Sequence, residues 1–203
     1  MPNWCMNELT VTGNTEELKR FVEASMGLPA DYPPQPWEKE PRTKPTVPYF
    51  SFNALIPTPK EVLEIGFDGH DKILDLNMKY ALRGQTVYPI DDYHWNIANW
   101  GTKWDIYHDA ITAETMGWHE GADHICFEFD TAWSPPDKWR ASVGKLFPAL
   151  QFKLHYEEPG CFFAGDMFVS EGVTTIVECT DAQCEKLFSW MFEDTDEQVT
   201  EAM

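Results

Sequence analysis

The feature that most constrains the fold is a strand pattern that leads directly into a helix start, within residues 125–137. Ile125, Phe127 and Phe129 are apolar and alternate with polar or small residues, which is the period of a half-buried β-strand. A strand with one apolar face has to bury that face against a second layer. The sequence therefore predicts a sheet, with the helix that follows as part of its covering layer.

That helix is predicted to begin within 134–137. Ser134 is a suitable cap, Pro135 is favoured at the first helical position, and Asp137 falls at the third. The periodicity of the apolar residues predicts a buried stripe of Trp139, Val143, Leu146 and Phe147.

A second segment, residues 91–111, joins a helical pattern to an extended one. Asp91 and Asp92 can accept hydrogen bonds from free amides at a helix start, and Gly101 can take the left-handed conformation that ends a helix. From Lys103 onward the residues alternate, which predicts a strand. One face of this strand is predicted to present Trp104, Ile106 and His108. We interpret the segment first as a connection between elements and second as a functional surface.

The remaining elements follow from capping residues, turn residues and periodicity. Strands are predicted at 4–12, 49–55, 151–157, 161–169 and 173–179, and helices after Asn14, at 58–65, at 71–82 and after Thr180. This order predicts an α+β fold, a ferredoxin-like antiparallel sheet with helices packed on one face, made by 1–203 as a single domain. Within it we predict a proline-rich loop at 29–48, an acidic helical insertion at 56–102 and a disordered acidic tail at 194–203.

Charge limits the classes of partner. The net charge is −19; residues 61–130 carry 14 acidic and 4 basic side chains, and 171–203 carry 9 and 1. Direct nucleic-acid binding draws on clustered Lys and Arg and is not expected, whereas a partner with a basic surface fits. The sequence has no run long enough to span a membrane and no secretory pattern at the N-terminus, so we expect a cytoplasmic protein without membrane contact.

Metal binding is the first chemistry to weigh, because His119, His124 and Cys126 lie close together. Two His five residues apart do not share a helix face, unlike the pattern of zinc proteases. On a strand, only His124 and Cys126 would share a face, which is too few ligands for a closed site. We therefore predict no metal.

Nucleophiles and cofactor motifs are equally unsupported. Pro2 would become an N-terminal amine if Met1 were removed, but basic residues that could support it as a general base are not evident. Cys5 and Cys161 have no recognisable His and acid arrangement, and reduced cysteines near the core are expected. Phosphate-binding glycine motifs are absent. We predict no catalytic residue and no cofactor.

Three motifs occur in order along the chain: NWCMNELTVTG at 3–13, NWGTKWD at 99–105 and FDTAWSPP at 129–136. With these motifs the sequence resembles the YubB or Api-like family of plasmid, phage and bacterial proteins that carry a ferredoxin-like domain. The resemblance implies that fold and a mobile-element setting. It implies no activity and no catalytic residues.

Three functions stay open. The leading one is a non-enzymatic interaction protein of a phage or plasmid that binds a host protein, such as a defence component, in the host cytoplasm. The alternatives are an acidic nucleic-acid mimic that blocks a DNA-binding enzyme, and a small-ligand binder or enzyme. The oligomeric state is not predicted. The residues expected to form a partner surface or pocket are Trp100, Lys103, Trp104, Asp105 and Trp133.

Overall fold

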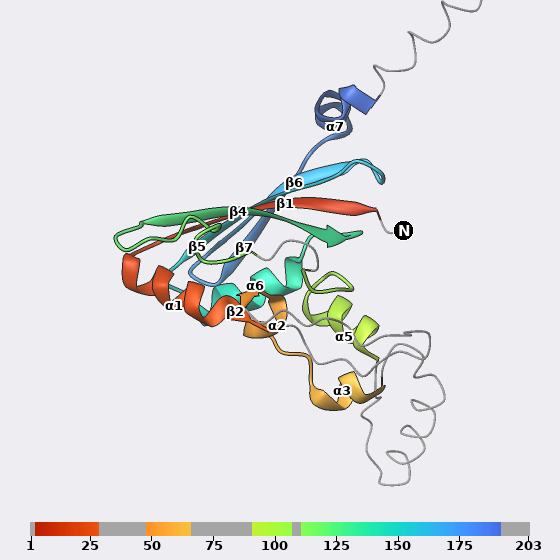
Figure 1. Cartoon of the computed structure of the whole chain (residues 1–203). Helices are drawn as coiled ribbons and strands as arrows, with labels where there is room; N and C mark the ends of the chain where they lie inside the picture. Colours follow the sequence, from red (N-terminus) through yellow and green to blue (C-terminus); the bar gives the residue numbers. More distant parts are fainter. Residues whose placement is uncertain (1–2, 29–47, 66–90, 107–110, 192–203) are drawn as a thin grey trace, which may run out of the picture.

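The computed structural model describes residues 3–28, 48–65, 91–106 and 111–191, and these are built around a five-stranded antiparallel sheet. The strand order is β4 (His124–Ala132), β1 (Trp4–Thr12), β5 (Gln151–Glu158), β6 (Phe163–Ser170) and β7 (Val173–Glu178). One face of the sheet is covered by α1 (Thr15–Ser25), α2 (Phe52–Leu55) and α6 (Asp137–Leu146), as Figure 1 shows. The predicted α+β, ferredoxin-like fold is confirmed.

The other elements lie around this two-layer core. They are β2 (Met26–Gly27) and β3 (Tyr49–Phe50), which pair with each other, α3 (Lys60–Ile65), α5 (Asp92–Asn99), α7 (Asp181–Leu187) and the 3-10 turn η1 (Ser189–Met191). Helix α7 lies on the opposite side of the sheet from α1 and α6 (Figure 1). There its Cys184 and the following Phe188 pack with Ala164 of β6.

Strand β1 shows how the period of two produces the layers. Cys5, Leu9 and Val11 are buried, whereas Trp4 and Glu8 are exposed, because successive side chains of a strand point to opposite faces. We call the face that α1 and α6 leave uncovered the open face. Trp4 and Glu8 lie on it.

An aromatic cluster centred on Phe50 fills the core beneath β4. The Phe50 ring lies 4.8 Å, between centroids, from that of Phe127 and 5.5 Å from that of Trp139, with edge-to-face geometry in both cases. Phe52 and Phe129 complete the cluster at 6.1 and 5.8 Å. Such pairs add to the stabilisation that comes from apolar burial, so this cluster fixes α2 and α6 against the sheet.

Several local predictions are confirmed. The Asn14 side chain accepts a hydrogen bond from the Glu17 amide at the start of α1, and Asp91 accepts one from the His94 amide at the start of α5. Gly101 has a φ of +89° just beyond α5, as predicted. The helix predicted after Thr180 is also present, and Thr180 forms a capping box with Gln183 at its start.

Two predicted strands were wrong. Only Tyr49–Phe50 of 49–55 is a strand; a helix follows, because its free amides find an acceptor on a distant residue described below. Residues 103–106 form no strand: the chain bends at 101–104, and Trp104 is exposed whereas Ile106 is buried. The alternating residues do not form a strand here, because Gly101 turns the chain before it can reach a neighbouring strand and pair with it.

The predicted start and stripe of α6 were wrong in part. The helix begins at Asp137, and the Ser134 hydroxyl donates to the Gly101 carbonyl (2.7 Å) instead of capping it. Trp139 and Val143 are buried, but Leu146 is 49% exposed, since it lies in the last turn, beyond the edge of the sheet contact.

Some predictions fall outside the described residues. These are nearly all of the proline-rich loop at 29–48, the helix at 71–82 and the tail at 194–203. Of the insertion predicted at 56–102, the structure describes α3 and α5. No helix in the described ranges is long and apolar enough to cross a membrane.

Candidate functional site

Three half-exposed tryptophans lie at the end of the sheet where β1 begins and β4 ends, and two of them are close to Lys103. The Lys103 Nζ lies 4.1 Å from the ring centroid of Trp104 and 5.7 Å from that of Trp133. Trp4 lies beside Trp104, with ring centroids 6.5 Å apart. Their exposed fractions are 36% for Trp4, 42% for Trp104 and 44% for Trp133. We call these four residues the tryptophan surface.

The backbone holds Trp133 in an unusual conformation. Its φ is +72°, the left-handed region that a bulky side chain rarely occupies, and its amide donates to the Asn3 carbonyl (3.0 Å). Such strain persists only where surrounding contacts require it, and it gathers at functional sites. Here the strained position presents an indole to solvent beside Lys103, whose pKa is lowered by burial against the rings.

The other two residues predicted for the site, Trp100 and Asp105, are directed into the fold. Trp100 is fully buried, and its Nε1 donates to the Ile56 carbonyl (2.9 Å). The structure therefore brings Lys103, Trp104 and Trp133 together but places Trp100 and Asp105 outside their surface.

Asp105 holds the start of α2. Its carboxylate accepts hydrogen bonds from the Ser51 hydroxyl (2.6 Å) and from the amides of Phe52 (2.7 Å), Asn53 (3.2 Å) and Ile106 (2.9 Å). A helix start leaves its first amides without partners inside the helix, and Asp105 supplies the acceptor from 53 residues beyond Phe52. Burial raises the pKa of Asp105, and these hydrogen bonds oppose the rise.

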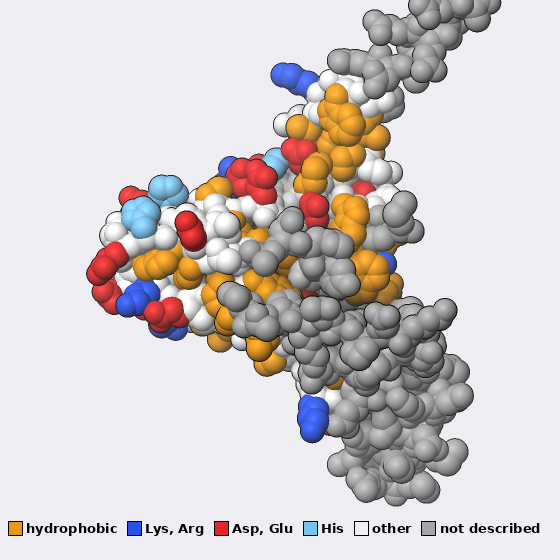
Figure 2. Space-filling model, viewed as in Figure 1, with side chains coloured by type: hydrophobic (Ala, Val, Ile, Leu, Met, Phe, Trp, Pro, Cys, Tyr) orange, Lys and Arg blue, Asp and Glu red, His pale blue; other side chains and the backbone are white. Residues whose placement is uncertain are grey.

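The open face next to the tryptophan surface is acidic. In the five strands it carries one Lys or Arg side chain, Lys153, and several carboxylates: Glu8, Glu128, Asp130, Glu157 and Asp166. Figure 2 shows acidic side chains along this side of the molecule and hydrophobic atoms gathered over α7. The arrangement favours approach of a positively charged group.

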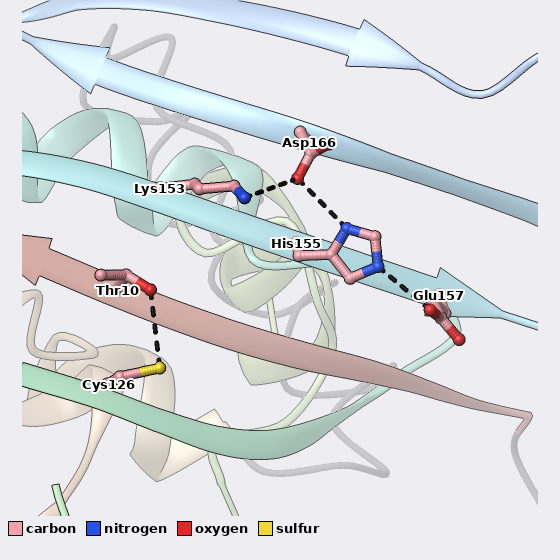
Figure 3. Close-up of polar contacts among 6 residues, drawn as sticks. All are labelled: Thr10, Cys126, Lys153, His155, Glu157 and Asp166. Carbon is pink, nitrogen blue, oxygen red and sulfur yellow. Dashed lines mark hydrogen bonds and ion pairs between the residues drawn. The ribbon is translucent and has the colours of Figure 1, made fainter.

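His155 bridges two of these carboxylates in the middle of the open face (Figure 3). Its Nδ1 lies 3.1 Å from Asp166 and its Nε2 3.0 Å from Glu157, while Lys153 Nζ lies 3.7 Å from Asp166. Burial lowers the pKa of His155, but its hydrogen bonds and charge interactions with Glu157 and Asp166 outweigh this, and the net shift is upward.

We expect His155 to make stability depend on pH. Because its pKa is raised in the folded state, its stabilising contribution is complete below the unfolded value of about 6.5 and is lost as pH rises through the folded value. The free energy of unfolding should exceed that of His155→Gln by up to about 1 kcal/mol at about pH 5.5, and the difference should vanish at about pH 8.5. Urea titrations at the two pH values measure it. His119→Gln, at an exposed loop position, controls for loss of an imidazole; an equal effect there would contradict the assignment.

Among the described residues no group of three or more His, Cys, Asp or Glu side chains is placed to hold a metal ion. His124 and Cys126 share the open face of β4, where the Thr10 hydroxyl donates to Cys126 Sγ (3.5 Å; Figure 3). The Cys5 thiol is buried, and burial raises its pKa to about 12, which removes the thiolate needed for nucleophilic attack. The pKa of Cys161 is also raised, first by its hydrogen bond with Glu158.

Sequence reasoning missed Trp4 and the acidic residues of the open face. The alternation of 4–12 did contain the signal: a strand covered on one side exposes every second residue, and in β1 these begin with Trp4, Met6 and Glu8. What alternation lacks is the strand order. Glu8 lies between Glu128 and His155 only because β1 pairs with both β4 and β5.

The chain is similar to a known family of proteins. A family model described as a ferredoxin-like domain in Api92-like protein matches residues 99–201, which include Lys103, Trp104 and Trp133. The crystal structure of a protein api92 from Yersinia pseudotuberculosis is similar with a TM-score of 0.46 and 10% sequence identity, over 89% of this chain and 99% of that chain. No curated protein matches the chain.

Proposed function

Because the chain belongs to the family of Api92-like proteins with a ferredoxin-like domain, we propose that it is a non-enzymatic interaction protein. Its tryptophan surface binds a protein partner with a basic surface. The observation that carries the proposal is the exposure of three neighbouring indoles, two of them close to Lys103. Trp is enriched among the few interface residues that supply most of the binding energy.

The fold fixes the backbone positions of the three exposed tryptophans before a partner binds. Trp4 is fixed by its place in β1, and Trp133 follows the end of β4, which pairs with β1. Trp104 lies between the anchors Gly101 and Asp105. Because these positions are set by the fold, little conformational freedom remains to be lost when a partner binds, and this favours affinity.

The acidic open face supports the choice of a basic partner. Its carboxylates outnumber its single Lys, and the whole chain carries −19. Arginine suits both parts of this site, because guanidinium groups stack on indole rings and pair with carboxylates in a planar geometry. We propose that arginine side chains of the partner contact the tryptophan surface and the neighbouring carboxylates together.

We expect Trp104→Ala with Trp133→Gly to weaken partner binding by about 2 kcal/mol or more, roughly thirtyfold. Glycine at 133 accepts the positive φ without strain, so the double variant removes two indoles at little cost to folding. The chain serves as bait in a lysate of its natural host, and the affinity of the captured protein is then measured by calorimetry.

Trp190→Ala is the matched control, because Trp190 is 58% exposed but lies in η1. The captured protein should bind this variant as it binds the unchanged chain, and rising salt should weaken the complex. Equal binding to the double variant, or a complex insensitive to salt, would reject the proposal.

A nucleic-acid mimic is the second candidate, and the row of carboxylates on the open face favours it. In that case the partner is a DNA-binding enzyme, and the chain and duplex DNA compete for the same groove. The fraction of chain displaced should therefore equal the fraction of enzyme that has bound duplex DNA. A ternary complex of chain, partner and DNA would exclude the mimic while leaving the tryptophan surface as the binding site.

The third candidate, a small-ligand binder or enzyme, has less structural support than the two protein-binding candidates. The described hollow on the open face, about 250 Å³, is lined by Thr10, Thr12, Lys153 and Phe168 among others, toward the end of β1 away from Trp4. Lys103 does not line this hollow. Lys103→Ala tests a ligand bound at the tryptophan surface, where this alternative was predicted, and Asp105 is left unchanged because it has a structural role. Binding to a host protein in the host cytoplasm, with the chain made by a phage or plasmid, stays a prediction from the resemblance.

A further inference from the structure

The β7 edge of the sheet is exposed along its whole length. All six residues of β7 are exposed, and Val173 at 67%, Ile176 at 46% and Val177 at 54% are among the most exposed aliphatic side chains of the described residues. Strand β7 is last in the sheet order. One side of its backbone therefore faces away from β6, and the described part of the chain shows no strand paired there.

The usual protections of an edge strand are missing from β7. Its sequence, VTTIVE, contains no Lys, Pro or Gly, and its pairing with β6 runs from Val173 to Glu178 without a bulge. Native proteins prevent edge pairing with such residues, with bulges or with a covering segment. The opposite edge shows the contrast: in β4 the Cys126 amide donates to the Met116 carbonyl of a neighbouring loop (3.2 Å).

The distribution of charge along β7 favours a second copy of this chain over a basic partner at this edge. A basic partner would find one carboxylate on β7, Glu178, at its end, and none from Val173 to Val177. Conversely, two copies of a chain with charge −19 repel each other. They can approach at least cost where neither contributes charge, and these five residues form such a stretch on an exposed edge.

The sequence of β7 also allows the strand to pair with β7 of a second copy. A two-fold axis perpendicular to the sheet keeps the open face on one side, so residues opposite each other must belong to the same face. Centred on Thr175, antiparallel pairing places each Val173 opposite Val177 of the other copy, and each Thr174 opposite Ile176. Glu178 lies beyond the paired stretch, opposite Gly172 and next to Glu171 of the other copy, so like charges approach only at the two ends.

We propose that two copies of this chain associate through β7, in antiparallel pairing centred on Thr175, to form a continuous ten-stranded sheet. The backbone groups of the two edges satisfy one another, and the valine pairs are removed from water. The contact is short and buries little area, which corresponds to a weak, transient dimer. The tryptophan surface is left free, so this association is independent of the proposed function.

Sedimentation equilibrium over a range of concentrations tests the dimer. The unchanged chain should dimerise, and Val177→Lys should raise the dissociation constant by about tenfold or more, because a Lys on an edge opposes pairing. Leu146→Lys makes the same charge change at a 49% exposed site on α6 and should have no effect. Added salt should strengthen the dimer, whereas it weakens a complex with a basic partner.

A second measurement does not depend on how Val177→Lys folds. With Cys126→Ser and Cys161→Ser to remove the exposed thiols, Thr175→Cys should form a covalent dimer under copper-catalysed air oxidation, because the two residues 175 are adjacent across the axis. Thr174→Cys lies opposite Ile176 and should cross-link far less. A chain that stays monomeric and does not cross-link at residue 175, or a dimer equally weakened by Leu146→Lys, would overturn the proposal.

Discussion

Replacing Asp105 with alanine is expected to lower the free energy of unfolding by about 3 kcal/mol. The substitution leaves the amides of Phe52 and Asn53, the Ser51 hydroxyl and the Ile106 amide without their acceptor. An unsatisfied buried donor costs about 1–3 kcal/mol, and water replaces the carboxylate in part because Asp105 is half-buried. Urea unfolding followed by tryptophan fluorescence measures the change.

Two controls separate this role from that of any surface aspartate. Asp105→Asn keeps one acceptor oxygen and should lose about half as much stability. Asp123→Ala removes a carboxylate whose side chain is 90% exposed and should change stability by less than about 0.5 kcal/mol. If Asp105→Ala is as stable as Asp123→Ala, the carboxylate does not hold the start of α2.

Gly101→Ala is expected to cost about 3 kcal/mol, for a reason in two parts. The φ of +89° at Gly101 disfavours any side chain by about 1–2 kcal/mol. In addition, a Cβ at this position would overlap Asp137 Oδ1 and lie 3.0 Å from the Asp137 nitrogen and 3.1 Å from the Pro135 carbonyl oxygen. The backbone atoms cannot move without disturbing the start of α6, so the strain remains.

Gly117→Ala is the matched control for backbone conformation. Gly117 has a φ of +77°, but a Cβ there would meet no atom within 4 Å. Thermal unfolding should therefore show the conformational cost alone for Gly117→Ala and a clearly larger loss for Gly101→Ala. Equal losses would mean that the contact with α6 carries no energy.

Gly101 and Asp105 both bear on the proposed function, because they lie on either side of Lys103 and Trp104. The Gly101 carbonyl accepts from Ser134, next to Trp133, and the Asp105 carboxylate anchors the following turn to α2. Weakening either anchor should lower partner affinity along with stability. Trp104→Ala should lower affinity while stability changes little, and this difference distinguishes contact with the partner from support of the surface.

The sequence predicted those elements whose signals are local. The strand at 4–12, the caps at Asn14 and Asp91 and the left-handed Gly101 are correct, because a period of two, a side-chain acceptor at a helix start and the freedom of glycine act over a few residues. The order of the predicted elements then indicated the fold class, and the motifs of the resemblance implied the same fold. For the same reason Lys103, Trp104 and Trp133 could be named as candidates before their contacts were known.

Only the tertiary structure decided which of the candidates share a surface. The helix at Phe52–Leu55 depends on the carboxylate of Asp105, and Trp4 joins Trp104 because the chain returns to β1 after a hundred residues. The strand order likewise places Glu8 beside His155 and leaves β7 at the edge. These contacts join residues far apart in the chain, and no local pattern records a pairing whose energy arises only when both segments are folded.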